Sequence, residues 1–485
     1  MATTPRYLEI AARLRRSVAA GVTRPGQRMI SARRLAVREG VSLPTAVAAL
    51  RALESAGLIV ARARSGYFAC AARTDVPAPS RPPTKPSAVG LSTTAFDITA
   101  ASRRMPVALA AASPHPDWLP LRAMRRALNS ALRRAAGDAL LYSPVPGHDG
   151  LRQQLALLAS SWGGEIPRDE IVVTAGATQA LRLALRVTCR AGDIVAVESP
   201  TYFGLLTLLE SLGLKALEVA SDPVTGLDIA ALATMLEQYG VAAVIASPTV
   251  QNPLGTIMPL AAKRALVALL ERARVPLIED DVYGDLAEGR TRPPACKAFD
   301  GTGSVLYCSS VSKTLAPGWR TGWIAAGRFT ERVLRLRWEE SLAGSPVLEG
   351  ALAEFLRSGD YRRHLQNFRP RITTAVKAVA ARVQAGFPPG TLISRPVAGY
   401  LLWVELPATI DSREVHSRAL SLGIGIAPGQ IFSPRAQYSH HLRLSCAQNV
   451  SPKLLHALDR LGELCCELDA AAASHSRAAV AKPTR

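Results

Sequence analysis

A proline-rich segment divides this chain into two parts of different character. Residues 73–95 contain five prolines and few large apolar side chains, a composition typical of an extended, semi-rigid tether. With 485 residues, the chain is too long for one ordinary hydrophobic core. The sequence therefore predicts a small domain at 1–72, a linker at 73–95 and a large domain from about residue 96.

The first 72 residues are strongly basic. They hold 12 arginines, no lysine and three acidic residues, which contributes 12 − 3 = +9 to the chain's net charge of +20. A surplus concentrated in so short a part of the chain indicates an anionic partner such as nucleic acid.

Three short helices are predicted in this basic part. The first is indicated by apolar residues that recur at helical spacing from Leu8 onward. Ser31 can cap a second helix and Ser42 a third, because a serine at this place accepts a hydrogen bond from the first helical turn. Gly40 and Gly57 follow these two helices, and glycine is the usual residue at a helix end.

A β-hairpin is predicted after the third helix. Residues 58–63 and 67–71 alternate around Arg64-Ser65-Gly66, which is typical of two strands joined by a tight turn. Two helices, a turn and such a wing form a winged helix-turn-helix, whose second helix enters the major groove while flanking arginines contact phosphates. The alternative is a basic helical domain whose arginines are only solvated. The candidate DNA contacts are Arg33, Arg34, Ser42, Thr45, Arg51, Arg62, Arg64 and Ser65.

This segment resembles the winged-helix domain of GntR-type regulators. Two departures bear on DNA contact: Met29-Ile30 stands where the family usually has Leu-Pro, and Leu43 stands where arginine usually follows Val-Ser. The missing arginine removes one phosphate or base contact, so the operator need not resemble a typical one. The matching stretches are Tyr7-Leu8-Glu9-Ile10-Ala11, Pro25-Gly26, Ser31-Ala32-Arg33-Arg34-Leu35-Ala36, Val41-Ser42 and Gly66-Tyr67-Phe68.

From about 96 to 470, long helical stretches alternate with short apolar strands. This alternation predicts a large α/β domain around a mostly parallel sheet. Small, polar and basic residues at 471–485 predict a disordered tail. The clearest strands are 171–173, 194–197, 244–246, 277–278 and 305–308.

Several classes of protein are excluded by simple features. The apolar runs are far shorter than the roughly 20 residues that span a bilayer, and arginines interrupt the first helix where a signal peptide needs an apolar core. We expect a cytoplasmic protein with no membrane partner. Seven cysteines without a C-x-x-C spacing predict no metal site and no disulfide framework.

The large domain contains a strand that leads into a short turn rich in serine, with one lysine. Its residue types match the needs of pyridoxal phosphate. This cofactor needs an amine for its aldehyde, an anion for its pyridine nitrogen, and donors for its phosphate and ring oxygen. The stretch from Tyr307 to Arg320 follows an apolar strand and contains Ser310, Ser312 and Lys313 at the spacing S-x-S-K-x-x-x-x-x-x-R. It resembles type I aminotransferases, which implies that Lys313 forms the internal aldimine and that Ser310 and Arg320 bind phosphate.

Two further stretches resemble the same family. A strand that ends in carboxylates lies where ligands of α/β sheets bind, and the resemblance implies that Asp280 pairs with the pyridine nitrogen and Tyr283 with the ring oxygen. Asp281, one residue on, is the alternative acid. The turn that starts at Asn252-Pro253 resembles the family's N-P-x-G turn, whose asparagine hydrogen-bonds the ring oxygen; the alternative is an ordinary Asn-Pro turn.

The remaining candidates also come from the resemblance. Small residues after the first strand let backbone N–H groups reach a phosphate, and the matching positions are Ala177 and Thr178. Tyr202 resembles the tyrosine that stacks on the pyridine, although a core aromatic is the alternative. Tyr142 resembles the tyrosine that reaches the phosphate across a dimer interface. Arg443 resembles the arginine that grips a substrate carboxylate in a bidentate fork.

Together the two parts resemble MocR-type regulators over about residues 5–465. The resemblance implies a multidomain fold: a winged helix-turn-helix, then a fold type I transferase domain with a smaller C-terminal α+β subdomain from about residue 345. It implies a pyridoxal-phosphate-dependent transcriptional regulator that senses the cofactor or an amino compound through an aldimine. The expected partners are an operator with repeated half-sites, an amine or amino-acid effector and a second copy of the chain.

Two other interpretations stay open. One is a working aminotransferase for an amino acid and 2-oxo acid pair that carries an accessory basic domain; residual half-reactions fit either interpretation. The other is a regulator whose cofactor site has decayed, against which the intact Lys313, Asp280, Asn252 and Arg320 argue.

Overall fold

The computed structural model forms two compact units, residues 1–76 and 77–485. The division falls inside the proline-rich segment, and each unit is considered by itself. The residues that the structure describes are 7, 10, 11, 13, 14, 27–55, 59–62, 66–69, 76–287 and 292–480.

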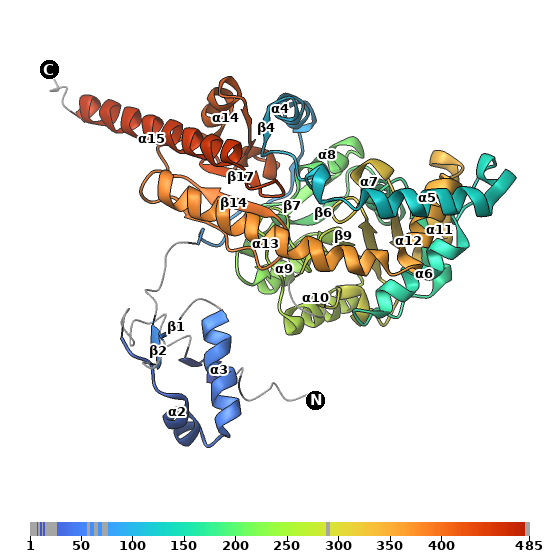
Figure 1. Cartoon of the computed structure of the whole chain (residues 1–485), viewed down its shortest axis with the longest axis horizontal. Helices are drawn as coiled ribbons and strands as arrows, with labels where there is room; N and C mark the ends of the chain where they lie inside the picture. The colour runs from blue at the N-terminus through green and yellow to red at the C-terminus, as the bar shows by residue number, and fades with distance from the viewer. Residues whose placement is uncertain are drawn as a thin grey trace. The chain divides into compact units, whose positions relative to one another are not determined.

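The N-terminal unit contains two described helices followed by a hairpin (Figure 1). The strands pair antiparallel, with Val60 opposite Phe68. The predicted first helix lies largely outside the described residues, as does the turn of the wing. The described elements are α2 (Ala32–Glu39), α3 (Leu43–Ser55), β1 (Ile59–Arg62) and β2 (Gly66–Ala69).

The predicted helix caps are confirmed. The Ser31 side chain accepts a hydrogen bond from the Arg34 backbone N–H at 3.3 Å. Gly40 ends α2 with φ 60°, a left-handed conformation that suits glycine. The Ser42 side chain accepts from the Thr45 backbone N–H at 3.4 Å, so these short-range signals set where α2 and α3 begin.

A small core holds the N-terminal unit together. Met29, which departs from the GntR pattern, is part of this core. Its side chain is buried, and its backbone N–H donates to the Tyr67 carbonyl at 2.8 Å. Met29 therefore serves packing. The buried residues of this core are Ile10, Ala11, Leu14, Met29, Leu35, Ala46, Ala49, Leu50, Leu53 and Ile59.

The large unit is built on a mixed, mostly parallel sheet, as predicted. The strand order is β3-β7-β6-β9-β10-β11-β12-β5, with β8 beside β7. Strands β7, β6, β9, β10 and β11 run parallel, β12 is antiparallel to β11, and β5 is antiparallel to β12. The strands are β3 (Ser87–Ala88), β5 (Ile171–Thr174), β6 (Ile194–Ser199), β7 (Lys215–Asp222), β8 (Gly226–Leu227), β9 (Val241–Ala246), β10 (Leu277–Asp280), β11 (Val305–Ser310) and β12 (Gly322–Ala325).

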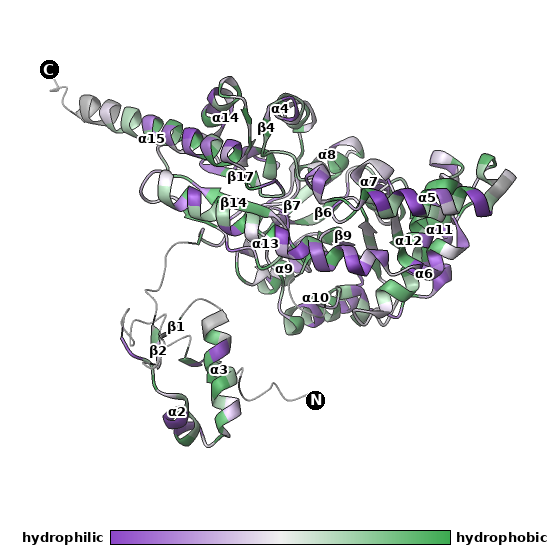
Figure 2. Ribbon diagram, in the orientation of Figure 1, coloured by the Kyte–Doolittle hydropathy of each residue, from purple (hydrophilic) through white to green (hydrophobic). Residues whose placement is uncertain are grey.

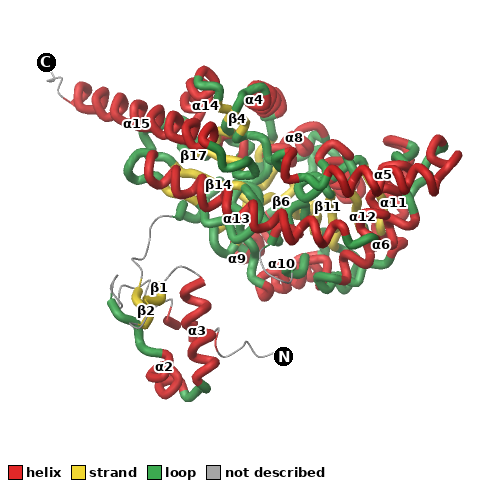
Figure 3. Tube along the Cα trace, in the orientation of Figure 1, coloured by secondary structure: helices red, strands yellow, loops and turns green. Residues whose placement is uncertain are grey.

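Helices cover both faces of this sheet, so the strands lie inside a helical shell (Figure 3). Successive residues of a strand point to opposite faces: Val172 belongs to one hydrophobic core, whereas Ile171 and Val173 belong to another. Hydrophilic residues gather on outer helices such as α5 and α13 (Figure 2). The covering helices are α5 (Leu121–Ala135), α6 (Asp149–Ser160), α7 (Ala177–Thr188), α8 (Phe203–Ser211), α9 (Ile229–Gln238), α10 (Leu260–Ala273), α11 (Thr330–Ser341), α12 (Pro346–Arg357) and α13 (Asp360–Gly386).

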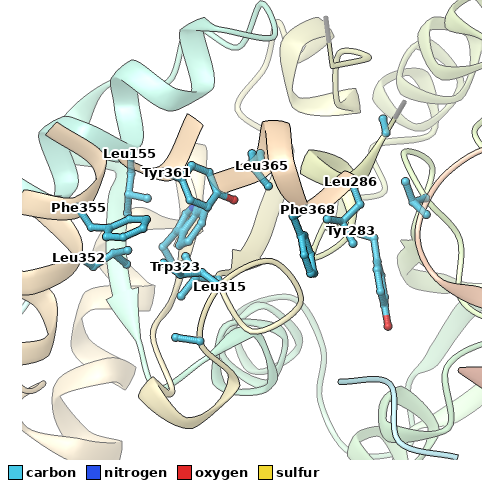
Figure 4. Close-up of a cluster of buried hydrophobic side chains, with 14 of the residues drawn as sticks. Leu155, Tyr283, Leu286, Leu315, Trp323, Leu352, Phe355, Tyr361, Leu365 and Phe368 are labelled. Carbon is cyan, nitrogen blue, oxygen red and sulfur yellow. The ribbon is translucent and has the colours of Figure 1, made fainter. Parts of the chain in front are cut away.

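Helix α12 belongs to the large core, which corrects the predicted start of the small subdomain near residue 345. Leu352 and Phe355 of α12 are fully buried in the same cluster as Leu155 of α6 and Trp323 of β12 (Figure 4). The long helix α13 then carries Phe368 into this cluster. The apolar side chains of α12 are buried against elements that pack on the large sheet. The small subdomain therefore starts along α13.

A second, smaller sheet forms the subdomain, with order β13-β14-β17-β16. Helices α13 and α15 lie side by side against it (Figure 1). The N-terminal end of the large unit also joins it, because β4 pairs in parallel with β15 and Leu109 enters its core. The remaining elements are α4 (Ser92–Arg103), β4 (Val107–Ala108), β13 (Leu392–Ile393), β14 (Leu401–Glu405), α14 (Ser412–Ser421), β15 (Ile424–Gly425), β16 (Ala427–Pro428), β17 (His441–Ser445) and α15 (Pro452–Val480).

The predicted disordered tail is helical over its described part. Helix α15 continues to Val480, past residue 470 where the tail was expected to begin. A run of four alanines, 470–473, explains this, because alanine has the highest intrinsic helix propensity. Among the described residues, every helix is too short or too polar to cross a bilayer.

Candidate cofactor, ligand and DNA sites

A cavity of about 800 Å³ lies where the parallel strands end. Segments that follow β5, β6, β9, β10 and β11 all line it, because parallel strands bring their carboxyl ends to one edge of a sheet. The predicted site residues that line this cavity are Ala177, Thr178, Tyr202, Asn252, Asp280, Tyr283, Ser310, Lys313, Arg320 and Arg443.

Lys313 lies in the turn after β11. Its Nζ donates a hydrogen bond to the Ala112 carbonyl at 2.8 Å and lies 5.8 Å from the centre of the Tyr283 ring. Burial, followed by the charge of Arg443, lowers the pKa of Lys313 to about 8, and the carboxylate of Asp280 opposes this shift. The amine is therefore neutral, and nucleophilic, at a lower pH than an ordinary lysine.

Asp280 and Asp281 have different surroundings. Asp281 is buried and forms an ion pair with Arg292, away from the cavity. Asp280 lines the cavity, and its Oδ1 has no hydrogen-bond partner among the described residues. Burial, followed by the charge of Asp281, raises the pKa of Asp280 to about 7, and Lys313 lowers it. A buried carboxylate with an open oxygen is suited to a cationic partner.

Other side chains at the cavity also have open polar atoms, Asn252 and Ser312 among them. Asn252 Oδ1 and Ser312 Oγ are buried without a hydrogen-bond partner in the described part of the chain. Buried polar groups in native proteins are almost always paired. Their arrangement around Lys313 indicates that a polar ligand completes this site.

One end of the cavity forms an anion cradle. Helix α7 begins at Ala177, which leaves its first backbone N–H groups free to meet an anion. Gly176 precedes it with φ 85°, and a Cβ there would lie 2.6 Å from Arg320 Nη2. Arg320 Nη2 donates to the Ala175 carbonyl at 3.3 Å. Only glycine lets the guanidinium approach this turn so closely.

Arg443 lies on β17 with 1% of its surface exposed. Its Nη2 donates to the Ala110 carbonyl, while Nε and Nη1 have no partner among the described residues. The guanidinium lies 5.3 Å from the centre of the Phe432 ring and 5.8 Å from that of Phe203. Burial lowers the pKa of Arg443. Two open N–H donors on a buried cation match a carboxylate.

Tyr142 is the one pocket candidate that does not line this cavity. It is 80% exposed. Ser143 forms an isolated bridge with Gly344, which brings this segment beside the end of α11. Large apolar side chains are exposed around both segments, namely Leu140, Leu141, Tyr142, Trp338 and Leu342.

The sequence patterns did not predict the residues that form one wall of the cavity. Thr99 and Arg103 of α4, residues 110–113 and Phe203 also line it. The only local sign in the sequence was the pair Arg103-Arg104 at the end of a helical stretch. This pair gives no indication that α4 packs near the strand ends of the large sheet.

Four of the five candidate DNA contacts whose side chains are described are exposed. Arg33, Arg34, Ser42 and Arg51 are exposed, and Thr45 is half-buried with its hydroxyl 2.8 Å from that of Ser42. These arginines form no ion pair with a described carboxylate. Three predicted contacts on the wing lie outside the residues whose side chains are described: Arg62, Arg64 and Ser65.

Comparisons with known protein families assign a different family to each of the two units. Residues 6–68 match the family described as bacterial regulatory proteins, gntR family, and residues 110–461 match aminotransferase class I and II. The chain belongs to the GntR-type regulators fused to an aminotransferase domain. This is the MocR-type architecture that the sequence predicted.

Two relatives that are named as HTH-type transcriptional regulators match nearly the whole of this chain. It is 35% identical over 463 residues to the uncharacterized HTH-type transcriptional regulator YjiR of Escherichia coli strain K12, covering 94% of this chain and 98% of that protein. It is 38% identical over 461 residues to YdcR of the same strain, covering 95% and 98%. A solved structure of Pyrococcus horikoshii kynurenine aminotransferase is 27% identical with a TM-score of 0.72, covering 78% of this chain and 94% of that one.

Proposed function

We propose that this regulator holds pyridoxal phosphate in the cavity and detects an amine or amino acid there. The observation that carries the proposal is the group of open, buried polar atoms around Lys313, with a cationic cradle at one end and the Asp280 carboxylate among them. That distribution of charge matches a molecule with a phosphate, a basic ring nitrogen and a reactive aldehyde.

The chain's own residues would divide the work. When bound, pyridoxal phosphate supplies an aldehyde that reacts with amines and a ring that withdraws electrons. Lys313 would hold the aldehyde carbon covalently, and Asp280 would keep a proton on the ring nitrogen. Asn252 and Tyr283 would orient the ring oxygen.

The remaining candidates would hold the ends of the cofactor and its ligand. Ala177, Thr178, Ser310 and Arg320 would hold the phosphate, and Tyr202 would stack on the ring. Arg443 would bind the carboxylate of an amino acid, because its open Nε and Nη1 are buried donors on a charged group.

Binding in the cavity would then alter DNA recognition. A ligand shifts a conformational equilibrium only if it binds one state more tightly, so the amino compound would favour one arrangement of the large unit. The winged helices of a homodimer, acting in the cytoplasm, would engage repeated half-sites through Arg33, Arg34, Ser42, Thr45 and Arg51, and through Arg62, Arg64 and Ser65 of the wing.

The exposed apolar side chains around Tyr142 support the homodimer. Contiguous exposed apolar surface of this kind marks interaction sites. In a second copy packed on this surface, Tyr142 would reach the partner's phosphate cradle, so that each site is completed by both chains.

A dedicated aminotransferase is the second candidate. The full set of Lys313, Asp280 and Arg443 around one cavity favours it. Steady turnover of an amino donor and a 2-oxo acid at ordinary enzyme rates, without operator binding by the intact chain, would decide for the enzyme.

Footprinting on the chromosomal region that flanks the protein's own gene tests the proposed function. Protection of repeated half-sites is expected, and its extent or affinity should change when pyridoxal phosphate and candidate amines are added. Protection that is identical under all these conditions would contradict a sensing role.

The rate of cofactor uptake should level off with pH. Burial brings the pKa of Lys313 from the ordinary 10.5 to about 8, and only the neutral amine attacks an aldehyde. The rate of absorbance change after mixing cofactor-free protein with pyridoxal phosphate should therefore rise about tenfold from pH 7 to pH 9 and then change little. A rate that still climbs steeply above about pH 10 would show an unperturbed lysine.

Substitution of Arg33 or Arg34 by alanine should weaken DNA binding and leave the cofactor spectrum unchanged. Each loss of a phosphate contact should reduce the slope of log affinity against log salt by about one. Fluorescence anisotropy over a salt series measures this. Arg335→Ala, an exposed arginine of α11 in the large unit, removes the same charge and should leave the slope unchanged; loss of colour together with DNA binding would contradict the division of roles.

A further inference from the structure

The residue that follows Lys313 is held by two side chains of helix α13. Thr314 is fully buried. Its carbonyl oxygen lies 2.7 Å from His364 Nε2, and its hydroxyl lies 3.0 Å from the hydroxyl of Tyr361. Helix α13 therefore fixes both the backbone and the side chain of Thr314. Because a lysine side chain is a long, flexible stem, the direction of the Lys313 amine depends on how firmly the neighbouring backbone is held.

His364 is oriented as a donor to this carbonyl. Burial lowers the pKa of His364, so the imidazole is neutral at pH 7. A carbonyl oxygen only accepts hydrogen bonds, so the single ring proton is assigned to Nε2. The imidazole also stacks on Phe368, with the ring centres 5.0 Å apart. Together these contacts hold His364 toward Thr314.

Tyr361 belongs to a buried polar network that reaches the opposite side of the cofactor site. The Tyr361 hydroxyl donates to Asp285 Oδ2 at 2.6 Å. Arg292 Nη1 donates to Asp285 Oδ1 at 2.7 Å, and Arg292 Nη2 pairs with the carboxylate of Asp281. Asp281 directly follows Asp280 in the chain. The network therefore ends beside the carboxylate that is proposed for the ring nitrogen.

This network connects the two residues that would hold opposite sides of the cofactor. Lys313 would hold the aldehyde carbon and Asp280 the ring nitrogen, and each lies one residue from an end of the network. Tyr361 and Arg292 are both buried, and hydrogen bonds are stronger where little water competes, above all those to charged groups. Side chains outside the lining of the cavity thus hold Lys313 and Asp280 in a fixed relation.

Packing of α13 directs both side chains at this turn. Tyr361, His364, Leu365 and Phe368 recur at the spacing of one helical face, and all four are buried. Leu365 and Phe368 anchor that face in the large core (Figure 4). The same face therefore presents Tyr361 and His364 to Thr314.

We propose that Tyr361 and His364 are positioning residues for Lys313. They hold Thr314 so that the amine is directed at the aldehyde carbon of bound pyridoxal phosphate, and Tyr361 keeps the amine in register with Asp280. Groups that are already held at the right distance and angle react faster, because no orientation has to be found. The inference rests on the proposed function, from which it takes the cofactor and the role of Lys313, and it adds two residues that act through Thr314.

The test separates binding of the cofactor from its reaction with Lys313. Pyridoxine phosphate has the same ring and phosphate but an alcohol in place of the aldehyde, so it can occupy the site without reacting with an amine. Calorimetry measures its affinity for the cofactor-free, full-length protein. The reaction is measured as the rate of visible absorbance change after mixing with saturating pyridoxal phosphate, at a pH above the Lys313 pKa of about 8.

Tyr361→Phe keeps the ring and removes the hydroxyl. We expect the rate to fall about tenfold or more, because a small displacement of a reacting group has an effect of that size. The affinity for pyridoxine phosphate should be unchanged. Tyr239→Phe is the matched control, because it makes the same chemical change at the end of α9 in a different core; it should alter neither quantity.

Two substitutions of His364 give a second comparison. His364→Leu removes the donor to the Thr314 carbonyl and should slow the reaction without weakening pyridoxine phosphate. His364→Gln retains an N–H donor at a similar distance from the backbone, so it should recover most of the rate. Circular dichroism and the melting temperature of the cofactor-free proteins confirm that each variant is folded.

The outcomes distinguish this inference from the proposed function. A rate within a few-fold of the unmodified protein in both Tyr361→Phe and His364→Leu overturns the inference. So does an affinity for pyridoxine phosphate that falls as much as the rate, because the two residues would then support the shape of the site and not the direction of Lys313. The proposed function stands in both cases if the unmodified protein takes up pyridoxal phosphate; a protein that takes up none overturns both.

Discussion

Substitution of Lys313 by alanine should abolish the visible absorbance that the purified protein shows with pyridoxal phosphate. Lys313 is the one lysine among the described residues that line the cavity, so no other amine there can hold the aldehyde. The measurement is an absorbance spectrum after incubation with the cofactor and removal of the excess. Persistence of the same band would refute the assignment.

A matched control and a stability measurement sharpen this test. Lys377→Ala, on the exposed face of α13, removes the same charge and should keep the band. Because the pKa of Lys313 is lowered, the folded state disfavours its charged form, and this cost is present below pH 8 and disappears as the pH rises through the unfolded value. The cofactor-free Lys313→Ala protein should therefore melt at or above the temperature of the unmodified protein at pH 7.

Substitution of Arg443 by glutamine should reduce the affinity for amino acids on the order of 100-fold, because a buried carboxylate would lose its charged partner. The visible band should remain, since Lys313 and the anion cradle at the start of α7 are unchanged. Titration of that band with an amino acid measures the effect. An affinity within a few-fold of the unmodified protein would show that Arg443 does not bind the ligand.

Two comparisons distinguish ligand binding from a structural role of Arg443. Arg443→Lys keeps a positive charge but not the planar fork, so it should recover only part of the affinity. Removal of a buried cation with open Nε and Nη1 should not lower the melting temperature of the unliganded protein. A large loss of stability in Arg443→Gln would instead indicate that the guanidinium supports the fold.

Short-range features were predictable because their causes lie within a few residues. Ser31 and Ser42 cap their helices because a side chain reaches the backbone of its own first turn. The positions of Lys313, Asp280 and Asn252 followed in the same way from short motifs attached to strand ends. A parallel sheet then brings those ends together whatever the details of packing.

Longer-range features were not predictable from local pattern. The start of the small subdomain was placed near residue 345, yet α12 packs on α5 and α6 in the large core. The pairing of β4 with β15 joins segments more than 300 residues apart. Such contacts depend on which apolar faces remain to be covered once the sheet has formed, and a single sequence window does not contain that information.

The sequence by itself determined the two-part organisation, the class of each part and the lysine that lines the cavity, Lys313, because composition, periodicity and short motifs are local properties. The tertiary structure alone decided which of two neighbouring residues lines the cavity, and which residues from distant parts of the chain join it there. It placed Asp280 at the cavity and Asp281 against Arg292, because successive residues of a strand point to opposite sides. It also brought Arg103 to the cavity wall, because the packing of α4 beside β15 and β16 depends on contacts that no stretch of sequence encodes alone.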